Sequence, residues 1–240
     1  MKAIKGIVKK GFNLVGFDVV RLNQVPHHTF MGLKSLPVKT IIDVGANTGQ
    51  FAQMIAPIYP DAQIHCFEPL PEVYQELLNH AGKSGGRVTA YNVALGEKED
   101  VMTMHYHVNH DSSSSLLKTT KYGENLYPQT ERQVTISINQ TTLDKWMMDV
   151  SNILKPEILI KLDVQGYEDR VIRGGMNLFK RSKACILEIN LATLYHEQAS
   201  FRDIFLLLDK LGYCYSGNFD QICDNDGRII YVDSFFVRNI

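Results

Sequence analysis

Residues 41–49 read Ile41-Ile42-Asp43-Val44-Gly45-Ala46-Asn47-Thr48-Gly49, and this stretch is the most informative in the chain. An apolar run ends in an acid, continues into a loop of small residues and passes into a helical pattern. That order is typical of a buried strand that delivers a ligand to the N-terminus of a helix. Gly45 and Gly49 allow close backbone approach and a positive φ angle.

A second acid follows the next apolar run, Ile64-His65-Cys66-Phe67, which ends in Glu68. A carboxylate at this place can accept hydrogen bonds from both hydroxyls of a ribose. The two segments together predict a cofactor that carries a nucleoside.

The spacing of the first loop indicates which cofactor this is. A dinucleotide site needs G-x-G-x-x-G, because a pyrophosphate lies against backbone N–H groups. This chain has Asp43-x-Gly45-x-Asn47-x-Gly49 instead, which weighs against an NAD-type oxidoreductase. An acid at the strand end suits a ligand with an amine and a cationic centre. S-adenosylmethionine has both, together with a ribose and no phosphate.

Composition is that of an ordinary globular chain of 240 residues, with 45% hydrophobic and 21% charged residues. The net charge of −1 leaves no basic surplus for a nucleic-acid partner. Four scattered cysteines favour reduced thiols and a cytoplasmic location. No apolar run is long enough for a transmembrane segment.

The N-terminal segment 1–17 mixes lysines with apolar residues. Two interpretations are open: a helix that caps the domain, or an amphipathic helix that makes peripheral contact with a membrane surface.

Strand and helix patterns alternate through most of the chain, which predicts an α/β fold with a doubly wound, mostly parallel sheet. The predicted strands are 39–44, 62–67, 87–92, 158–163 and 184–188. The predicted helices are 48–58, 71–80, 166–173 and a segment from Ser200 to Gly212. Two last strands, 212–219 and 234–237, are expected as an antiparallel edge pair, with 228–231 between them.

The stretch 99–140 breaks this alternation. Residues around 101–107 and 134–138 show the two-residue period of strands, and they flank the polar loop 109–130. We expect a β-rich insertion at about 99–140 that carries part of the substrate site.

The chain resembles the FkbM-type S-adenosylmethionine-dependent methyltransferases. The resemblance covers roughly residues 39–190, and a serine-leucine loop, Ser112 to Leu116, also looks like the family's. The segments that carry it are Ile42-Asp43-Val44-Gly45-Ala46-Asn47-Thr48-Gly49, Phe67-Glu68-Pro69, Asn92-Val93-Ala94-Leu95-Gly96 and Lys161-Leu162-Asp163-Val164-Gln165-Gly166-Tyr167-Glu168.

The resemblance implies a class I methyltransferase, Rossmann-like fold with a seven-stranded sheet and helices on both faces. The predicted organisation is an N-terminal helical cap over 1–38 and a methyltransferase domain over 39–240. The resemblance also implies methylation of a hydroxyl oxygen, often on a sugar or a polyketide. The family commonly has an acid where this chain has Gln165, so any role that needs charge there is in doubt.

Five polar residues, each expected at the carboxyl end of a strand, should meet at one crevice. They are Asp43, Glu68, Asn92, Asp163 and Glu188. The resemblance implies that 45–49 bind the methionine part, Glu68 the ribose and 92–94 the adenine, with Ser114 and Ser115 closing over it. The predicted cofactor-binding residues are Asp43, Gly45, Ala46, Asn47, Thr48, Gly49, Glu68, Pro69, Asn92, Val93, Ala94, Ser114, Ser115 and Asp163.

An acceptor hydroxyl needs a base, because an alcohol is a weak nucleophile at neutral pH. Asp163 is the first candidate, and a helix-capping or cofactor-binding role is the alternative. Glu188 and His107 on the insertion are the further catalytic candidates. Asp163, Glu188 and Asn190 are the ligands expected if a divalent metal such as Mg²⁺ assists.

These observations favour an S-adenosylmethionine-dependent O-methyltransferase that acts on a sugar, glycan or natural-product hydroxyl. A metal-assisted enzyme of the same fold and a non-catalytic S-adenosylmethionine-binding protein are the alternatives. The aromatic C-terminal region is expected as edge-strand core or as the face of a homodimer.

Overall fold

The computed structural model describes residues 33–238 together with Phe12 and Leu14. The chain divides into two units, 1–36 and 37–240. Of the first unit the structure describes two exposed side chains, those of Phe12 and Leu14, and a short 3-10 helix at Leu33–Ser35. Residues 1–11, 13 and 15–32, which make up most of the predicted cap and of segment 1–17, lie outside the described residues, and the predicted membrane contact falls on them. Within the described part, no helix is long and apolar enough to cross a membrane.

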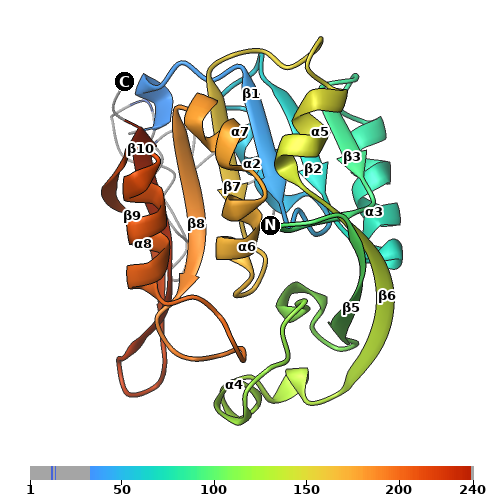
Figure 1. Ribbon diagram of the computed structural model, residues 1–240, viewed down its shortest axis with the longest axis vertical. Coiled ribbons are helices and arrows are strands. Elements are labelled where there is room, and N and C mark those ends of the chain that lie inside the picture. The colour runs from blue at the N-terminus through green and yellow to red at the C-terminus, as the bar shows by residue number, and fades with distance from the viewer. Residues whose placement is uncertain (1–11, 13, 15–32, 239–240) are drawn as a thin grey trace. The chain divides into compact units, whose positions relative to one another are not determined.

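The second unit is built on a seven-stranded sheet with the order β3-β2-β1-β7-β8-β10-β9 (Figure 1). Neighbouring strands pair in parallel from β3 to β8, and β10 runs antiparallel to both β8 and β9. The strands are β1 (Thr40–Val44), β2 (Gln63–Phe67), β3 (Val88–Tyr91), β7 (Ile158–Leu162), β8 (Ala184–Asn190), β9 (Tyr213–Cys223) and β10 (Ile229–Arg238). The predicted doubly wound, mostly parallel sheet is confirmed.

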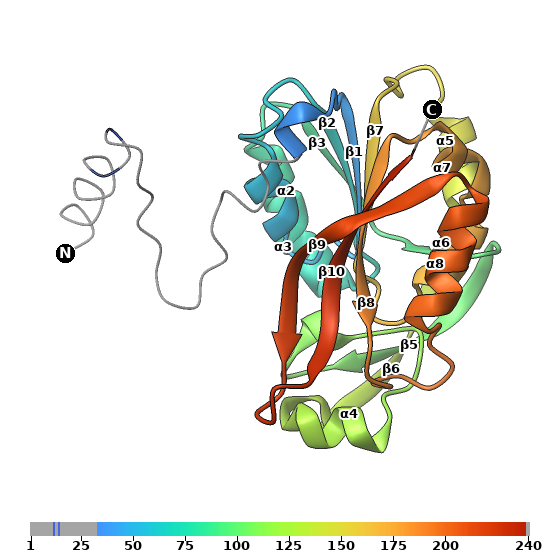
Figure 2. The same cartoon turned by 90° about the vertical axis from the view of Figure 1, so that its left-hand side faces the viewer.

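Helices cover both faces of this sheet. Figure 2 shows α2 and α3 on one side and α5, α6, α7 and α8 on the other. Strands β1 and β7 are buried along their whole length, as expected for central parallel strands with apolar sequences. The helices are α2 (Gln50–Ile55), α3 (Pro71–Gly82), α5 (Leu143–Asp149), α6 (Glu168–Arg173), α7 (Met176–Arg181) and α8 (Phe201–Lys210).

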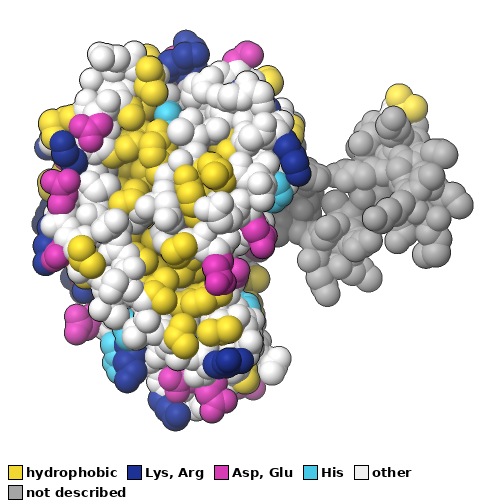
Figure 3. Space-filling model, turned by 90° about the vertical axis from the view of Figure 1, so that its right-hand side faces the viewer, with side chains coloured by type: hydrophobic (Ala, Val, Ile, Leu, Met, Phe, Trp, Pro, Cys, Tyr) yellow, Lys and Arg dark blue, Asp and Glu magenta, His cyan; other side chains and the backbone are white. Residues whose placement is uncertain are grey.

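The predicted β-rich insertion is a second, three-stranded sheet with the order β4-β6-β5. Its strands are β4 (Ala94–Leu95), β5 (Asp100–His107) and β6 (Gln133–Thr141), and α4 (Lys121–Leu126) lies in the connection between β5 and β6. Met104 and Ile138 on its inner face form a small core with Leu70 and Val73. A band of hydrophobic side chains runs down the face of the second unit on which α3, α5 and the insertion lie (Figure 3).

The structure differs from the predicted elements mainly after residue 140. Helices α5 and α7 were not predicted, since each has only six or seven residues and too little periodicity. Strand β10 begins at Ile229, so the expected connection 228–231 is mostly strand. Three register shifts between β9 and β10 interrupt the two-residue period, which explains why the sequence underestimates both strands.

Candidate active site

The loop after β1 lies against the loop after β7, and Gly45 is the point of contact. Its φ angle is +75°, and a Cβ atom there would lie 1.8 Å from the backbone oxygen of Asp163. The backbone N–H of Asp163 donates to the Val44 oxygen (3.0 Å), and the N–H of Gly45 donates to the Phe67 oxygen (3.1 Å). The expected close approach at Gly45 is confirmed, and only glycine fits there.

Glu68 lies immediately after β2 and its side chain is 4% exposed. Its two carboxylate oxygens accept hydrogen bonds from the backbone N–H groups of Asn47 (3.0 Å) and Leu70 (2.9 Å). Burial raises the pKa of Glu68 to about 7, although these two hydrogen bonds oppose the rise. The carboxylate is therefore held in one orientation, beside the β1 loop.

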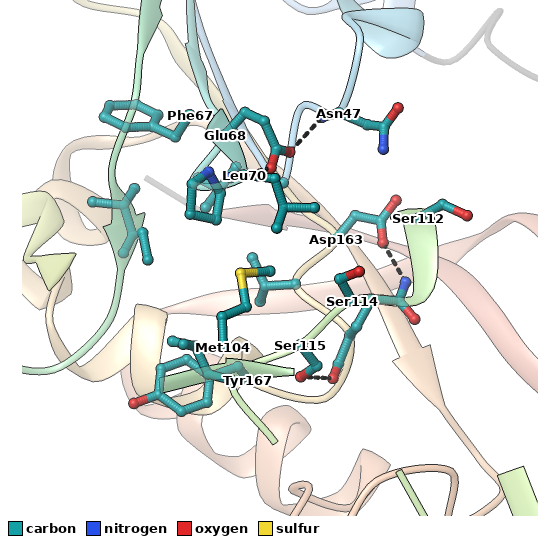
Figure 4. Close-up of a pocket in the computed structure, with 18 of the residues that line it drawn as sticks. Asn47, Phe67, Glu68, Leu70, Met104, Ser112, Ser114, Ser115, Asp163 and Tyr167 are labelled. Carbon is teal, nitrogen blue, oxygen red and sulfur yellow. Dashed lines mark hydrogen bonds between the residues drawn. The ribbon is translucent and has the colours of Figure 1, made fainter. Parts of the chain in front are cut away.

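A hollow of about 630 Å³, here called the first pocket, opens beside Glu68. Leu70 and Met104 project into it, and Tyr167 and Asp163 lie at its border (Figure 4). An apolar wall next to a fixed carboxylate suits a nucleoside, whose base is flat and whose ribose carries two hydroxyls.

Many of the predicted cofactor residues border the first pocket, and the others do not. Those at the border are Gly45, Asn47, Glu68, Pro69, Val93, Ala94, Ser114, Ser115 and Asp163. Those away from it are Asp43, Ala46, Thr48, Gly49 and Asn92. The residues that sequence reasoning missed include Leu70, Met104, Leu116 and Tyr167. The apolar residue directly after Glu68-Pro69 was the available signal for Leu70.

Asn92 corrects one of these expectations. Its Nδ2 donates to the backbone oxygens of Glu68 (2.9 Å) and Pro69 (3.0 Å), so this side chain holds the turn after β2 rather than facing the pocket. Ser115 is also engaged within the protein, where its hydroxyl donates to the backbone oxygen of Gln165 (2.7 Å) and accepts from the N–H of Leu117 (3.0 Å).

Lys161 is the buried cation beneath the crevice. Its ammonium lies 3.0 Å from Asp163 Oδ2 and 3.7 Å from Asp43 Oδ1, so it pairs with both acids. Burial opposes its charge, but the carboxylates of Asp163 and Asp43 outweigh burial and raise the pKa of Lys161. Burial likewise raises the pKa of Asp43 to about 6, while Lys161 opposes the rise.

Gln165 joins the strand ends. Its Nε2 donates to Asp163 Oδ1 (2.7 Å) and Glu188 Oε1 (2.6 Å), and its Oε1 accepts from the Tyr195 hydroxyl (2.7 Å). The residue has φ +55°, and Glu168 fixes this loop by accepting from the N–H groups of Val164 and Gly166. An amide thus lies where the family commonly has an acid, and it provides the donor that two facing carboxylates require.

A second pocket of about 650 Å³ lies on the other side of Gln165. Asp163, Gln165 and Ser112 border both pockets. The other residues around the second pocket come from the insertion, from β8 and the loop after it, and from β10, and include Thr119, Tyr127, Thr130, Glu188, Asn190, Tyr195 and Tyr231. That the insertion carries part of a substrate site stays a prediction. The second pocket is the candidate for that site, because insertion residues border it.

Glu188 faces Asp233 of the antiparallel strand β10 in the register of the sheet. Burial is the main reason that the pKa of Glu188 is raised, and the negative charges of Asp163 and Asp233 raise it further. The ionised form of Glu188 is therefore less favoured than that of an exposed glutamate.

His107 was predicted as a possible catalytic residue, and its position argues against that role. It is completely buried. Its Nδ1 donates to the backbone oxygen of Thr130 (2.6 Å), and its Nε2 accepts from the Thr119 hydroxyl (2.9 Å). Both ring nitrogens are engaged, so His107 ties β5 to the loop of the insertion and has no nitrogen free for substrate.

The proposed magnesium ligands Asp163, Glu188 and Asn190 border the same pocket. The Nε2 group of Gln165 occupies the position between the two carboxylates where a cation would lie. Among the residues that the structure describes, no group of three or more His, Cys, Asp or Glu side chains is placed to hold a metal ion. The geometry gives a magnesium site no support.

The order of the seven strands, the acid after the second strand and the pocket beside it define a class I methyltransferase. The Methyltransferase FkbM domain model matches residues 43–215. The chain belongs to the FkbM methyltransferase family, which sets aside the NAD-type oxidoreductase alternative.

Among curated proteins, the chain is similar to 2-O-methyltransferase NoeI of Sinorhizobium fredii, with 28% identity over 188 residues and 76% of each chain covered. Among solved structures, it is similar to precorrin-6y C5,15-methyltransferase from Geobacter metallireducens (12% identity, TM-score 0.43, 91% of this chain and 90% of that chain covered). It is also similar to TehB from Haemophilus influenzae (7% identity, TM-score 0.48, 91% and 64% covered).

Proposed function

We propose that this protein transfers a methyl group from S-adenosylmethionine to a hydroxyl oxygen of a sugar, glycan or natural-product acceptor. The observation that carries the proposal is the pair of pockets that share Asp163 and Gln165. One pocket has the features of a nucleoside site, and the other offers polar groups to a second ligand. The similarity to NoeI, a 2-O-methyltransferase by name, supports oxygen as the methylated atom.

The residues of the first pocket fit S-adenosylmethionine. Glu68 would accept from the ribose hydroxyls, and Leu70, Met104 and Leu116 would surround the adenine. The acids Asp43 and Asp163 outnumber their partner Lys161, so the crevice favours a ligand with positive charge. When bound, S-adenosylmethionine supplies an activated methyl group, so the protein's task is alignment and proton removal.

Asp163 is the proposed base because its carboxylate borders both pockets. Lys161 and Gln165 fix its two oxygens at 3.0 and 2.7 Å, which orients the carboxylate toward an acceptor hydroxyl in the second pocket. Asp163 would take the proton of that hydroxyl, and the hydroxyl oxygen would accept the methyl group that S-adenosylmethionine supplies, with S-adenosylhomocysteine as the leaving group. Glu188, which shares the Gln165 amide, would hold a second polar group of the acceptor.

Isothermal titration with S-adenosylhomocysteine tests the cofactor part. We expect micromolar binding by the wild type and loss of most of it in Glu68→Ala, because the ribose loses its acceptor. Asp163→Asn should bind the same ligand within a few fold and lose turnover of any acceptor. Absence of binding to the wild type would overturn the proposal. If Asp163→Asn binds S-adenosylhomocysteine and its turnover is undiminished, Asp163 is not the base.

A further inference from the structure

Asn190, the last residue of β8, has an unusual side chain. It is 4% exposed, and neither its Nδ2 nor its Oδ1 has a hydrogen-bond partner within the described part of the chain. A buried amide that makes no hydrogen bond opposes folding, and native proteins rarely keep one without a reason.

The strand geometry places this amide on the side of the second pocket. Alternate residues along a strand face the same side, so Asn190 shares its side with Glu188. Glu188 reaches the Gln165 amide at 2.6 Å, whereas Ile189 between them packs into the main core. Both Glu188 and Asn190 border the second pocket.

The rest of the second pocket indicates what kind of ligand it suits. Three tyrosines border it, and the described residues at its border include no lysine or arginine. The nearby ammonium of Lys161 is already paired with two carboxylates. Tyrosine rings suit the C–H faces of a ring, and an amide offers both a donor and an acceptor to hydroxyls.

We propose that the second pocket binds the acceptor as a neutral, hydroxyl-rich ring, and that the Asn190 amide is a specificity-determining group that holds a hydroxyl other than the one methylated. This inference rests on the proposed function and goes beyond it, because it states the acceptor class and assigns its recognition to one residue. An anionic acceptor would lie beside the Asp163 carboxylate, and no lysine or arginine among the described border residues would offset the two negative charges.

The test measures transfer of a radiolabelled methyl group from S-adenosylmethionine to a fixed panel. The panel contains methyl pyranosides of neutral hexoses and 6-deoxyhexoses, their monodeoxy analogues, a methyl hexuronate with a free carboxylate, and catechol. Wild type is compared with Asn190→Leu, with the isosteric Asn190→Asp, and with Asn152→Leu as control. Asn152 is exposed in the loop before β7, at the opposite end of the sheet.

We expect the wild type to methylate at least one neutral pyranoside and to prefer it to the hexuronate and catechol. Asn190→Leu and Asn190→Asp should lower kcat/KM for that acceptor by about 30-fold or more, because a hydroxyl loses its partner. S-adenosylhomocysteine should bind both variants within about twofold of the wild type. With the wild type, one monodeoxy analogue should show a loss of kcat/KM as large as the loss that Asn190→Leu shows with the parent pyranoside. With Asn190→Leu, the same analogue should show little further loss, since both changes remove the same contact.

Melting of the ligand-free proteins separates recognition from a structural role. An unpaired amide contributes nothing to folding, so Asn190→Leu should melt at the same temperature as the wild type or higher. Unchanged kcat/KM in Asn190→Asp overturns the assignment of Asn190, even if the leucine variant fails to fold. Exclusive methylation of the hexuronate or catechol, or of nothing in the panel by a wild type that binds S-adenosylhomocysteine, overturns the acceptor class. A wild type that fails to bind S-adenosylhomocysteine overturns the proposed function instead.

Discussion

The two pockets that meet at Gln165 differ in whether the protein itself supplies hydrogen-bond partners to their polar side chains. In the first pocket, Glu68 is hydrogen-bonded by two backbone N–H groups, and Ser115 both donates and accepts within the protein. In the second, the side-chain amide of Asn190 has no hydrogen-bond partner among the described residues. A site for an unchanging cofactor can be completed by the fold itself, whereas a site for a selected acceptor keeps groups that only the acceptor can satisfy.

The pockets also differ in how the chain builds them. The first joins strand ends and the short loops that directly follow them, including the contact of Gly45 with Asp163, to one wall from the insertion that includes Met104 and Ser115. The second draws on the insertion, β8 and β10, which are far apart in sequence.

Gly45→Ala should have the largest effect, because its Cβ would lie 1.8 Å from a backbone oxygen that cannot move aside. We expect a loss of about 4 kcal/mol or more in the free energy of unfolding. Gly85→Ala is the matched control, with φ +67° and nothing within 4 Å of its added Cβ, and should cost only about 1 kcal/mol. Urea denaturation measures both, and equal losses would show that the contact of the two loops is unimportant.

Lys161→Met should come next, because it leaves the carboxylates of Asp43 and Asp163 without their cation. Breaking a buried ion pair costs about 3–5 kcal/mol. The loss should be larger at pH 8 than at pH 5, because burial raises the pKa of Asp43 to about 6 and its protonated form at the lower pH needs no cation. Lys98→Met breaks an exposed pair with Asp100 and should have a far smaller effect on stability. Similar losses in both variants would contradict a buried charge network beneath the crevice.

The pH dependence of cofactor affinity should have an intermediate size. Ribose hydroxyls need the ionised form of Glu68, whose pKa is raised to about 7 by burial. Affinity for S-adenosylhomocysteine should therefore rise about tenfold from pH 6 to pH 8. In the ligand-free protein, Glu68 binds its proton more tightly in the folded state than in the unfolded state. Its contribution to the free energy of unfolding is therefore fully present below about pH 4.5 and is lost as pH rises through about 7.

Glu68→Gln is the control for this dependence, because Asp43 and Glu168 also titrate near this range. The glutamine variant should bind more weakly and with little change between pH 6 and pH 8. An equal slope in both proteins would assign the titration to another carboxyl group.

Ser115→Ala and Ser112→Ala should give the smallest effects and still differ. Ser115 makes two buried hydrogen bonds, and their loss should cost about 1–2 kcal/mol in unfolding free energy. Ser112 is exposed, and its hydroxyl lies 3.3 Å from His110, so its replacement should change stability by less than about 0.5 kcal/mol. Thermal denaturation compares them, and the reverse order would contradict the role given to Ser115.

The fold was largely predictable because its central strands are short apolar runs, each separated by a loop and an amphipathic helix. The predictions were wrong where tertiary context replaces local pattern. The pair Gly174-Gly175 separates two short helices instead of ending one, and the bulged strand β10 loses its two-residue period. No local signal reveals how a distant strand shifts register.

The candidate site was predictable to a similar degree. Glu68 and Gly45 follow directly from position at a strand end, because parallel strands bring their carboxyl ends to one edge of the sheet. Met104 and the three tyrosines of the second pocket were missed, since nothing local distinguishes a pocket residue from a core residue. His107 was misjudged because its two hydrogen-bond partners, Thr119 and Thr130, lie in a loop whose path the sequence does not reveal.

The pairing of β1 with β7 has a consequence for how the protein folds. Thr40 lies opposite Ile158, so closing this ladder requires a chain loop on the order of a hundred residues, which slows folding relative to local contacts. Strands β5 and β6 lie inside that loop and pair with each other alone along most of their length. The insertion can therefore form as a local hairpin before the central sheet is complete, and the crevice takes its final shape only when the last long-range ladder closes.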